Sequence, residues 1–499
     1  MCDKLGMRIP FRLALLAITM LLATAAVAAT PVADGGAPTS LPLFSGGPAP
    51  RQPFRAKRPP TNPFMARRGV SNIHNDSWMS DAYWIRGPLG RNPETFSSAL
   101  GLRVCVTITF DREDRLIATC TGLAGPVLYM LDPETLDVIT SMVLPFVPAP
   151  PGQDPFTNSS GGAYFYLDNK DRAVIGTATG HIWIVGHTDG PAPTFVLEQD
   201  IDVTGALGDD RITSVLPDWM GRRWFVGRYT GVVGVADEQG GVWATTLDEE
   251  VENSFAIDRD GVYIVSDVAM YRMWAGVRQA PVVVWSEPYQ NSGVKKPGQF
   301  NAGSGTTPTL MTGGYVAITD NADHMNVVVY RRDATLAPGE SRVVCETPVF
   351  TAGASATENS LIAVNDSLIV ENNYGYVVTT TQNGAVSSPG VARVDVRPDA
   401  SGCDVVWTSS ERAPSLVPKL STKTGLLYLY TKDPDPVNTT SDAWFWTAVD
   451  FRDGRTVWKR YAGTGINFNN HYAGLVIARR SRTAYLGVLG GVAAIRDRY

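Results

Sequence analysis

Beyond residue 100, apolar residues come in short runs, either alternating with polar residues or continuous, and helical periodicity is nearly absent. Three stretches read as tight hairpins, with two such runs around a polar or glycine-rich turn: residues 253–258 with 262–267, 309–311 with 315–320, and 361–364 with 367–371. Asp-Gly, Gly-Gly and Asn-Asp in these turns supply the backbone conformations that tight hairpins need. The pattern predicts an all-β chain.

The hairpins belong to a repeat whose corresponding residues lie 51 to 54 positions apart. Each copy has a polar triplet before the first strand and an acid or amide after the second: Glu252-Asn253-Ser254 with Asp267, Thr306-Thr307-Pro308 with Asp320-Asn321, and Glu358-Asn359-Ser360 with Glu371-Asn372. A period of this length carried by strands is typical of β-propeller blades.

We therefore predict a propeller of four-stranded antiparallel blades over residues 69–499, with eight blades preferred and seven as the alternative. Residues 104–145, 163–204 and 212–248 each contain three or four strand-like runs and are predicted to be the earlier blades. The last repeat, residues 472–496, is short, so a strand within residues 82–103 would have to complete it. Such closure removes exposed sheet edges.

The fourth strand of a repeat often ends in tryptophan, at Trp243, Trp285, Trp407 and Trp458, with Cys345 at the equivalent place in the remaining copy. Before Trp458 stands Val449-Asp450-Phe451-Arg452-Asp453-Gly454-Arg455-Thr456-Val457. This stretch resembles the repeat of quinoprotein-type propellers, in which an Asp-containing turn with Gly precedes a docking Trp. The resemblance implies that the Trp residues pack between blades.

Hairpin geometry places the polar residues of the repeat at one end of the propeller axis. The innermost strand begins, and the next strand ends, at the same end, because the two are antiparallel neighbours joined by a short turn. Mirror symmetry about each turn gives three pairs: Glu252 with Asp267, Thr306 with Asp320, and Asn359 with Asn372. The innermost strand of the last repeat starts near His471, which brings this histidine to the same end.

Carboxylates and amides gathered at an axis suit calcium, which accepts oxygen ligands of both kinds, and a bound cation would relieve repulsion between the acids. The predicted ligands are Glu252, Asn253, Asp267, Asp320, Asn321, Glu358, Asn359 and Glu371. The arrangement loosely resembles the calcium-bearing propellers of the gluconolactonase and paraoxonase type. This resemblance implies a hydrolase for an ester or lactone, in which calcium polarises the carbonyl and His471 acts as general base.

Two other interpretations stay open. Asp and Asn at strand ends also cap turns, so repetition alone could produce the spacing in a non-catalytic propeller that binds a protein or a polymer. The quinoprotein resemblance implies a third function, a quinone-dependent oxidoreductase. The chain has neither the adjacent Cys-Cys pair nor the CxxCH haem motif frequent in that family, so pyrroloquinoline quinone is not expected as a cofactor.

The first residues have the form of a secretory signal peptide. Lys4, Arg8 and Arg12 precede an apolar run, residues 13–25, and small residues offer a cleavage site near Ala28. We predict a signal peptide over residues 1–29 and, because nine prolines follow, a disordered linker over residues 30–68. The protein is therefore expected in the periplasm or outside the cell, with no membrane span in the mature chain.

The cysteines that follow the signal peptide fit an oxidising compartment. Cys105 and Cys120 lie symmetrically about a polar turn, so we predict a disulfide across that hairpin. Cys345 and Cys403 are predicted to form a second disulfide between neighbouring blades. The net charge of −6 gives no support for a nucleic-acid partner. We expect a monomer whose partner is a small-molecule substrate or a protein or polymer of the cell envelope.

Overall fold

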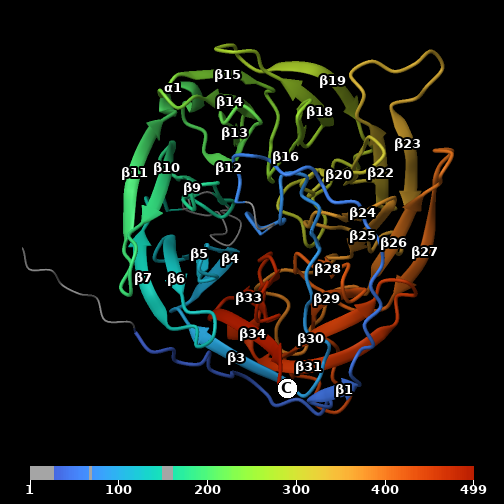
Figure 1. Cartoon of the computed structure of the whole chain (residues 1–499). Helices are drawn as coiled ribbons and strands as arrows, with labels where there is room; N and C mark the ends of the chain where they lie inside the picture. The colour runs from blue at the N-terminus through green and yellow to red at the C-terminus, as the bar shows by residue number, and fades with distance from the viewer. Residues whose placement is uncertain (1–26, 67–69, 149–160, 499) are drawn as a thin grey trace, which may run out of the picture.

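The computed structural model describes residues 27–66, 70–148 and 161–498. Most of the predicted signal peptide lies outside these ranges. Eight blades surround a common axis, each with four antiparallel strands that are consecutive in the chain or three such strands completed by an N-terminal one (Figure 1). Two further N-terminal strands extend the sheet of one blade to six strands. The predicted eight-bladed propeller is confirmed. The first strand of each blade is innermost. We use the name start end for the end of the axis at which these innermost strands begin, and the name far end for the opposite end.

Blades 1 to 4 follow one another along the chain with the same strand order. Blade 1 is β4 (Arg103–Phe110), β5 (Leu116–Gly122), β6 (Val127–Leu131) and β7 (Val138–Val143). Blade 2 is β8 (Tyr166–Leu167), β9 (Ala173–Gly176), β10 (His181–His187) and β11 (Phe195–Asp202). The short helix α1 (Thr204–Leu207) leads to blade 3, which is β12 (Ile212–Pro217), β13 (Arg223–Gly227), β14 (Val232–Ala236) and β15 (Val242–Thr246). Blade 4 is β16 (Ala256–Ile257), β17 (Val262–Val265), β18 (Ala269–Trp274) and β19 (Val282–Pro288).

Blades 5 to 8 continue the ring and close it. Blade 5 is β20 (Thr309–Met311), β21 (Tyr315–Thr319), β22 (Asn326–Arg331) and β23 (Val343–Pro348). Blade 6 is β24 (Ile362–Val364), β25 (Ser367–Glu371), β26 (Val391–Val396) and β27 (Cys403–Ser409). Blade 7 is β28 (Lys419–Ser421), β29 (Leu426–Thr431), β30 (Ala443–Asp450) and β31 (Thr456–Thr464). A 3-10 helix, Ile466–Phe468, precedes blade 8, which is β32 (Val476–Ile477), β33 (Ala484–Val488) and β34 (Gly491–Asp497).

An N-terminal strand completes blade 8, as the short last repeat predicts. Strand β3 (Pro93–Ala99) pairs antiparallel with β34 over its whole length and becomes the outermost strand. The first blade and the last are thereby tied to each other through the chain that joins β3 to β4. This closure covers an edge that would otherwise expose unpaired backbone groups.

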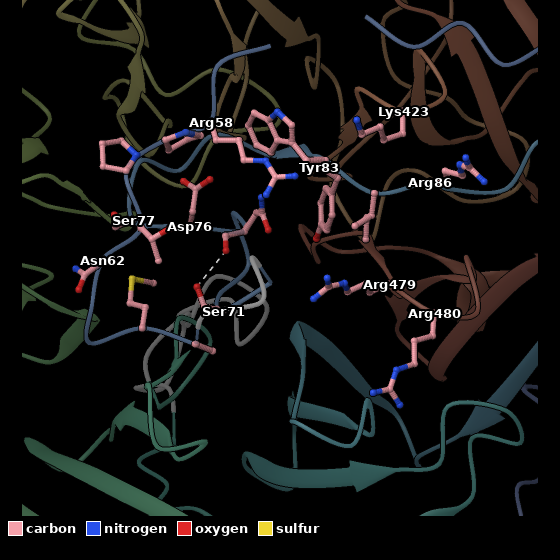
Figure 2. Close-up of a pocket in the computed structure, with 18 of the residues that line it drawn as sticks. Arg58, Asn62, Ser71, Asp76, Ser77, Tyr83, Arg86, Lys423, Arg479 and Arg480 are labelled. Carbon is pink, nitrogen blue, oxygen red and sulfur yellow. Dashed lines mark hydrogen bonds between the residues drawn. The ribbon is translucent and has the colours of Figure 1, made fainter. Parts of the chain in front are cut away.

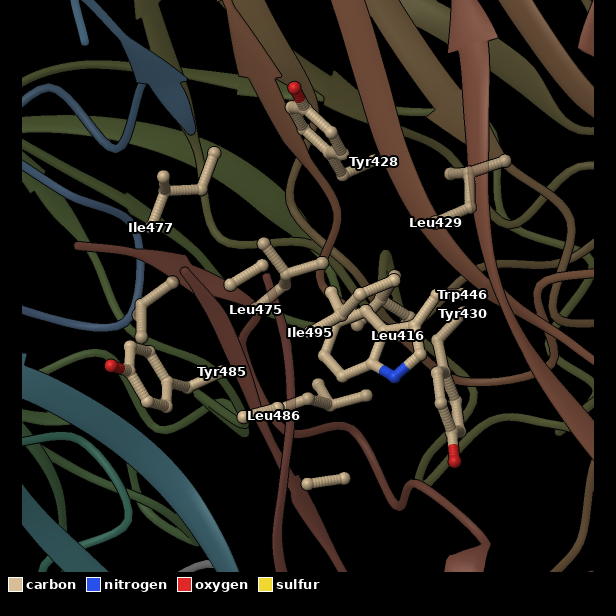
Figure 3. Packing of buried hydrophobic residues seen from close by; sticks show 14 of the residues in the cluster. Leu416, Tyr428, Leu429, Tyr430, Trp446, Leu475, Ile477, Tyr485, Leu486 and Ile495 are labelled. Carbon is tan, nitrogen blue, oxygen red and sulfur yellow. The ribbon is translucent and has the colours of Figure 1, made fainter. Parts of the chain in front are cut away.

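The middle strands of each blade are apolar on both faces because each face packs against a neighbouring blade. All eight residues of β30 are buried, and Tyr430 of β29 stacks on Trp444 with ring centroids 5.4 Å apart. Figure 3 shows this packing between blades 7 and 8, where Leu416 and Trp446 face Leu475, Leu486 and Ile495. The outermost strands have an open face, and β19 is largely exposed.

The tryptophans predicted for the fourth strands lie in β15, β19, β27 and β31. Trp407 of β27 packs between blades 6 and 7, and its indole Nε1 donates to the carbonyl oxygen of Phe451 at 3.0 Å. Gly454 lies against the same ring, where a Cβ would come within 2.5 Å of the indole. The turn before Trp458 therefore receives the tryptophan of the preceding blade.

The N-terminal segment from residue 30 is not the disordered linker that its prolines suggest, wherever the structure describes it. Strand β1 (Phe44–Gly46) pairs with the outer edge of β31, and the backbone amides of Gln52 and Phe54 bond to the β28–β29 turn. Further on, Ala66 bonds to Leu167 in blade 2. Proline excludes a chain from the centre of a sheet but not from an extended path along its edges. The segment runs around the propeller and then across it (Figure 1).

Residues 71–83, which we call the axial segment, cross the axis and bond to the innermost strands. The carbonyl oxygens of Ser77, Trp78, Ser80 and Asp81 accept from the backbone amides of Ile257, Leu310, Ala363 and Leu420, in blades 4 to 7. Strand β2 (Ala82–Tyr83) then pairs in parallel with β28. The innermost strands thus find partners for amides on their free edges, and the axis is filled rather than open.

Both predicted disulfides are present. Cys105 and Cys120 face each other across the β4–β5 hairpin, and Cys345 of β23 is joined to Cys403 of β27 in the next blade. Within residues 27–66, 70–148 and 161–498, no helix has the length and apolar character needed to cross a bilayer.

Candidate active site

The hairpin registers agree with the symmetry predicted from the sequence. Ala256 pairs with Tyr263, Thr309 with Ala317, and Ile362 with Ile369. Extending these registers outward opposes Glu252 to Asp267, Thr306 to Asp320, and Asn359 to Asn372. The three triplets therefore stand at the start end of the axis in blades 4, 5 and 6.

A loop covers the start end. We call residues 289–305, between β19 and β20, the cover loop. It is fixed to blade 6 by the amide of Gly375, which donates to the carbonyl of Pro297 at 2.8 Å, and to blade 8 by the hydroxyl of Tyr472, which donates to the carbonyl of Gly298 at 2.5 Å. The Lys296 ammonium donates to the carbonyl of Ala322 in blade 5 at 2.6 Å. Side chains below the loop are shielded from water.

Glu252 and Glu358 lie below the cover loop as an interacting pair of buried carboxyl groups, each 6% exposed. Glu252 accepts from the Arg228 guanidinium at 3.2 Å through Oε1. By distance and angle, Oε2 of Glu252 and both carboxyl oxygens of Glu358 accept no hydrogen bond from a described residue. The cover-loop amides of Asn301 and Phe300 approach closely enough to lower the pKa values of Glu252 and Glu358 respectively. The fold alone does not satisfy these three oxygens, although buried polar atoms nearly always have partners.

Burial dominates the electrostatics of the pair. It raises the pKa of Glu252 to about 7 against the opposing charge of Arg228. Burial, followed by the charge of Glu252, raises the pKa of Glu358 well above its usual range. Lys295 in the cover loop lowers both pKa values. Burial therefore favours the protonated form of both carboxyl groups, and the Arg228 charge opposes this most directly at Glu252, to which it bonds.

A pocket of about 360 Å³ opens beside the pair and contains the predicted catalytic histidine. Its lining includes His471, Tyr376, Tyr472, Lys295 and Phe300. The ring of Tyr472 makes an edge contact with Phe300 and with Tyr376 at centroid distances of 5.0 and 5.4 Å. Three lining residues also interact with the carboxyl pair: the charges of both carboxyls raise the pKa of Tyr472, and Lys295 and the Phe300 amide lower that of Glu358. The pocket is therefore linked to the pair through these three residues, although neither carboxyl group lines it.

His471 itself lies among aromatic rings. Its Nδ1 is 3.2 Å from the Tyr376 hydroxyl, and its ring is 5.9 Å from that of Phe300. The structure brings His471 to the predicted end of the axis, at the wall of the pocket.

Other predicted ligands belong to a second group, deeper on the axis. Asn359 donates to Glu371 at 3.0 Å, and burial raises the pKa of Glu371 well above its usual range. The neighbouring Lys419 pairs with Asp81 of the axial segment. The Glu371 and Asn359 side chains thus face the group that anchors the axial segment, not the carboxyl pair.

Ser360, His74 and Asp81 also meet in this group but do not form a catalytic triad. Ser360 Oγ and Asp81 Oδ2 both contact the same ring nitrogen, His74 Nδ1, at 2.8 and 3.1 Å. A triad needs the serine and the aspartate on opposite nitrogens. All three side chains are buried, and we interpret them as an anchor for the axial segment.

Three more of the predicted ligands hold loops. Asp267 accepts from the amide of Glu250 at 2.9 Å, and Asp320 accepts from the amide of Asn326 at 2.7 Å. Asn321 donates to the cover-loop carbonyls of Val294 and Ala302 at 3.1 and 3.0 Å. These side chains fulfil the capping role that the sequence left open. The eight predicted ligands do not converge on one centre.

Of the predicted calcium ligands, Glu252, Glu358 and Asn253 fit a cation best. Their donors are carboxyl and amide oxygens, which calcium prefers, and three of the carboxyl oxygens lack partners. The Asn253 amide oxygen accepts from the Tyr164 hydroxyl at 2.8 Å. Arg228 and Lys295 already supply positive charge, so a cation would share the site with them.

Four residues of the site were not predicted from the sequence: Tyr164, Arg228, Lys295 and Tyr472. The hairpin symmetry applied to blade 3, where Ile212 pairs with Gly227, would have placed Arg228 at the start end. Tyr164 precedes the innermost strand of blade 2 in the same way. Lys295 lies in a loop without a repeat pattern and had no sequence signal.

A separate acidic cluster lies near the β4–β5 turn. Asp111, Glu113, Asp171 and His187 bring potential ligand atoms within 4.8 Å of one another. Arg115 pairs with both Asp111 and Glu113, at 2.5 and 3.2 Å, and His187 lies 3.4 Å from Asp171, so each acid already has a partner within the fold. We assign no ligand to it.

No protein-family model matches the chain. A protein from Archaeoglobus fulgidus described as uncharacterized is 27% identical over 277 residues, which cover 50% of this chain and 52% of that protein. The chain thus matches about half the length of this curated relative.

Solved structures that resemble the chain include Chaetomium thermophilum Sqt1, with a TM-score of 0.45, 12% identity, and coverage of 87% of this chain and 98% of that one. A catalytically inactive virginiamycin B lyase from Staphylococcus aureus, solved with quinupristin, has a TM-score of 0.42, 8% identity, and coverage of 81% and 99%. The Dos1 propeller has a TM-score of 0.37, 9% identity, and coverage of 79% and 78%. At these scores the likenesses carry no inference about function.

Proposed function

We propose that this protein is a hydrolase that cleaves a small ester or lactone at the start end of the propeller axis. The observation that carries the proposal is the pair of buried carboxyl groups, Glu252 and Glu358, which interact with Lys295, Phe300 and Tyr472 in the lining of a pocket that also contains His471. Ionisable groups with strongly shifted pKa values beside a pocket are characteristic of active sites.

The two carboxyl groups suit opposite roles in proton transfer. Arg228 bonds to Glu252 and favours its ionised form, so Glu252 is the proposed base that accepts a proton from the attacking water. Glu358, whose burial raises its pKa, is the proposed acid that gives its proton to the departing alcohol oxygen. The water oxygen forms the new bond to the acyl carbon as the ester C–O bond breaks. His471 is then a pocket residue that contacts the substrate.

Calcium is part of the proposal as a possible occupant of the same pair. Glu252, Asn253 and Glu358 would hold the ion, and when bound it would polarise the substrate carbonyl. Without the ion, Lys295 and Arg228 are the positive groups available near the carboxyl pair.

Export belongs to the proposal as well. The predicted signal peptide and the two disulfides, Cys105–Cys120 and Cys345–Cys403, both suit a protein that folds in an oxidising compartment.

The proposal is tested by measuring hydrolysis of short-chain p-nitrophenyl esters and of γ- and δ-lactones. We expect Glu358→Gln to lower kcat/KM by about a hundredfold or more, because the substituted amide cannot donate the catalytic proton. Glu371→Gln is the matched control, since Glu371 is equally buried but lies outside the pair, and it should keep the activity. Equal activity of wild type and Glu358→Gln, or no hydrolysis of either substrate class, would refute the proposal.

A chelator distinguishes a site that holds calcium from a site in which the carboxyl pair acts without a metal ion. If calcium is bound, EDTA should lower both the activity and the unfolding temperature, and calcium should restore them. If the carboxyl pair acts alone, EDTA should change neither.

A second candidate function is ligand binding without chemistry. It is favoured by a larger pocket of about 640 Å³ at the opposite, far end of the axis, which has its own chemical character.

A further inference from the structure

The far end of the axis has a pocket that is rich in cationic side chains. The axial segment forms its floor, and hairpins and the N-terminal segment form its walls (Figure 2). Its cationic residues are Arg58, Arg86, Lys423, Arg479, Arg480 and Arg482. They come from four separate places in the chain, namely the N-terminal segment, the stretch after β2, the β28–β29 turn and the β32–β33 turn.

This concentration of positive charge stands out in a chain whose net charge is −6. Among the described residues that line the pocket, six are cationic and one, Asp76, is acidic. Asp76 is half-buried and turned to its own segment, where it accepts from the Trp78 amide at 2.9 Å and the Ser80 hydroxyl at 2.6 Å. Arg480 pairs with Asp114 at 2.7 Å, outside the lining, and the remaining cations still leave the pocket positively charged for a ligand.

The floor of the pocket adds polar atoms that the fold leaves without partners. Asn75, Ser77 and Tyr83 line the pocket and are 3%, 1% and 1% exposed. Asn75 Oδ1 and Ser77 Oγ have no hydrogen-bond partner among the described residues, and the Tyr83 hydroxyl, which meets the same criterion, is approached by the backbone amide of Ile477. Figure 2 shows Ser77 on the side of Asp76 and Tyr83 on the side of Arg479. Hydroxyl groups without partners can donate to an anion as well as accept, unlike carboxylates.

We propose that this pocket binds a small ligand with more than one phosphate-like oxyanion group. Guanidinium groups on several sides can each make paired hydrogen bonds to phosphate oxygens, and the buried hydroxyls can complete the contacts. The volume of about 640 Å³ is that of a pocket for a small molecule. The site lies at the opposite end of the axis from Glu252 and Glu358, so it does not depend on the proposed hydrolase.

Calorimetric titration of the purified chain tests this site, with inorganic pyrophosphate, inorganic phosphate and uncharged glucose as probes. We expect saturable binding of pyrophosphate, weaker binding of phosphate and none of glucose. Binding of pyrophosphate should weaken as sodium chloride is added, because the attraction is electrostatic. Long-chain polyphosphate, compared at equal phosphate concentration, shows whether the ligand is a free small molecule or the end of a polymer.

Variants locate the binding. Arg479→Ala and Lys423→Ala alter exposed residues of two different turns and should each weaken pyrophosphate binding about fivefold or more, as loss of one charge-assisted contact does. Arg455→Ala removes an equally exposed arginine outside the pocket and should change nothing. Pyrophosphate binding that both pocket variants leave unchanged, equal binding of glucose, or no saturable binding below about 10 mM would overturn the proposal.

Discussion

The carboxyl group of Glu358 is the least compensated group of the proposed active site. It is 6% exposed, and by distance and angle neither oxygen accepts a hydrogen bond from a described residue, so the approach of the Phe300 amide compensates its burial only in part. A purely structural role would normally satisfy such a group, as Asn326 and Ala322 satisfy Asp320. We therefore interpret Glu358 as a residue that serves function and lowers stability. Gly305 lies next to Glu358 and leaves room for its carboxyl group.

Gly305→Ala should destabilise the protein and disturb the site. Gly305 has a φ of +70°, and a Cβ there would lie 2.2 Å from the carbonyl oxygen of Thr357 and 2.7 Å from Oε1 of Glu358. We expect a loss of about 2 kcal/mol or more from strain and contact with backbone together. Thermal unfolding measures it, and Gly314→Ala is the control, because Gly314 has a φ of +86° but open space around it. Equal losses for the two would mean that contact with Glu358 contributes nothing.

At the scale of elements, the regular geometry of the hairpins is what made the strand pairing predictable from the sequence. The turn centres in residues 252–267, 306–320 and 358–372 fixed the registers, and with them the end of the axis at which each triplet lies. The symmetry of a hairpin does not determine the direction in which each side chain points, so this could not be predicted. Glu252 and Glu358 reach the covered site, whereas Asp267 turns to the backbone of a neighbouring loop.

The two disulfides differ in the length of chain that they close. Cys105 and Cys120 are 15 residues apart, and Cys345 and Cys403 are 58 apart. On the loop-entropy argument the first stabilises by about 3 kcal/mol and the second by about 4 kcal/mol. Paired Cys→Ser variants, compared by thermal unfolding, should both be destabilised, with the larger loss for Cys345 and Cys403. A larger loss for the Cys105 and Cys120 variant would contradict the argument.

At the scale of the whole molecule, the N-terminal segment is where the structure differs most from the prediction. Its prolines correctly exclude a central strand, but they do not exclude β1 at the edge of blade 7 or the path across the axis. The sequence showed no repeat in residues 30–100, so nothing there indicated that residues 71–83 fill the axis. The closing strand β3 was predictable because the last repeat lacked a strand, and a closed ring of blades needs that strand to be supplied from elsewhere in the chain.

The two ends of the axis have opposite chemistry. The start end holds a carboxyl pair under the cover loop, and the far end holds a pocket with six cationic residues. The axial segment lies between them and closes the direct route. We therefore expect the two sites to be independent, so that variants at one end leave the other unchanged.

The most direct test of the central claim, an uncompensated carboxyl pair at the start end, is the unfolding temperature of wild type and Glu358→Gln between pH 5 and 8. A pKa raised from 4.5 to about 7, as at Glu252, means that the unfolded chain releases its proton first, so stability falls by about 3 kcal/mol as pH rises through that window. Glu358 shifts in the same direction. We expect the variant to gain in unfolding temperature relative to wild type as pH rises. A difference that is constant with pH, or that turns against the variant at pH 8, would contradict the account.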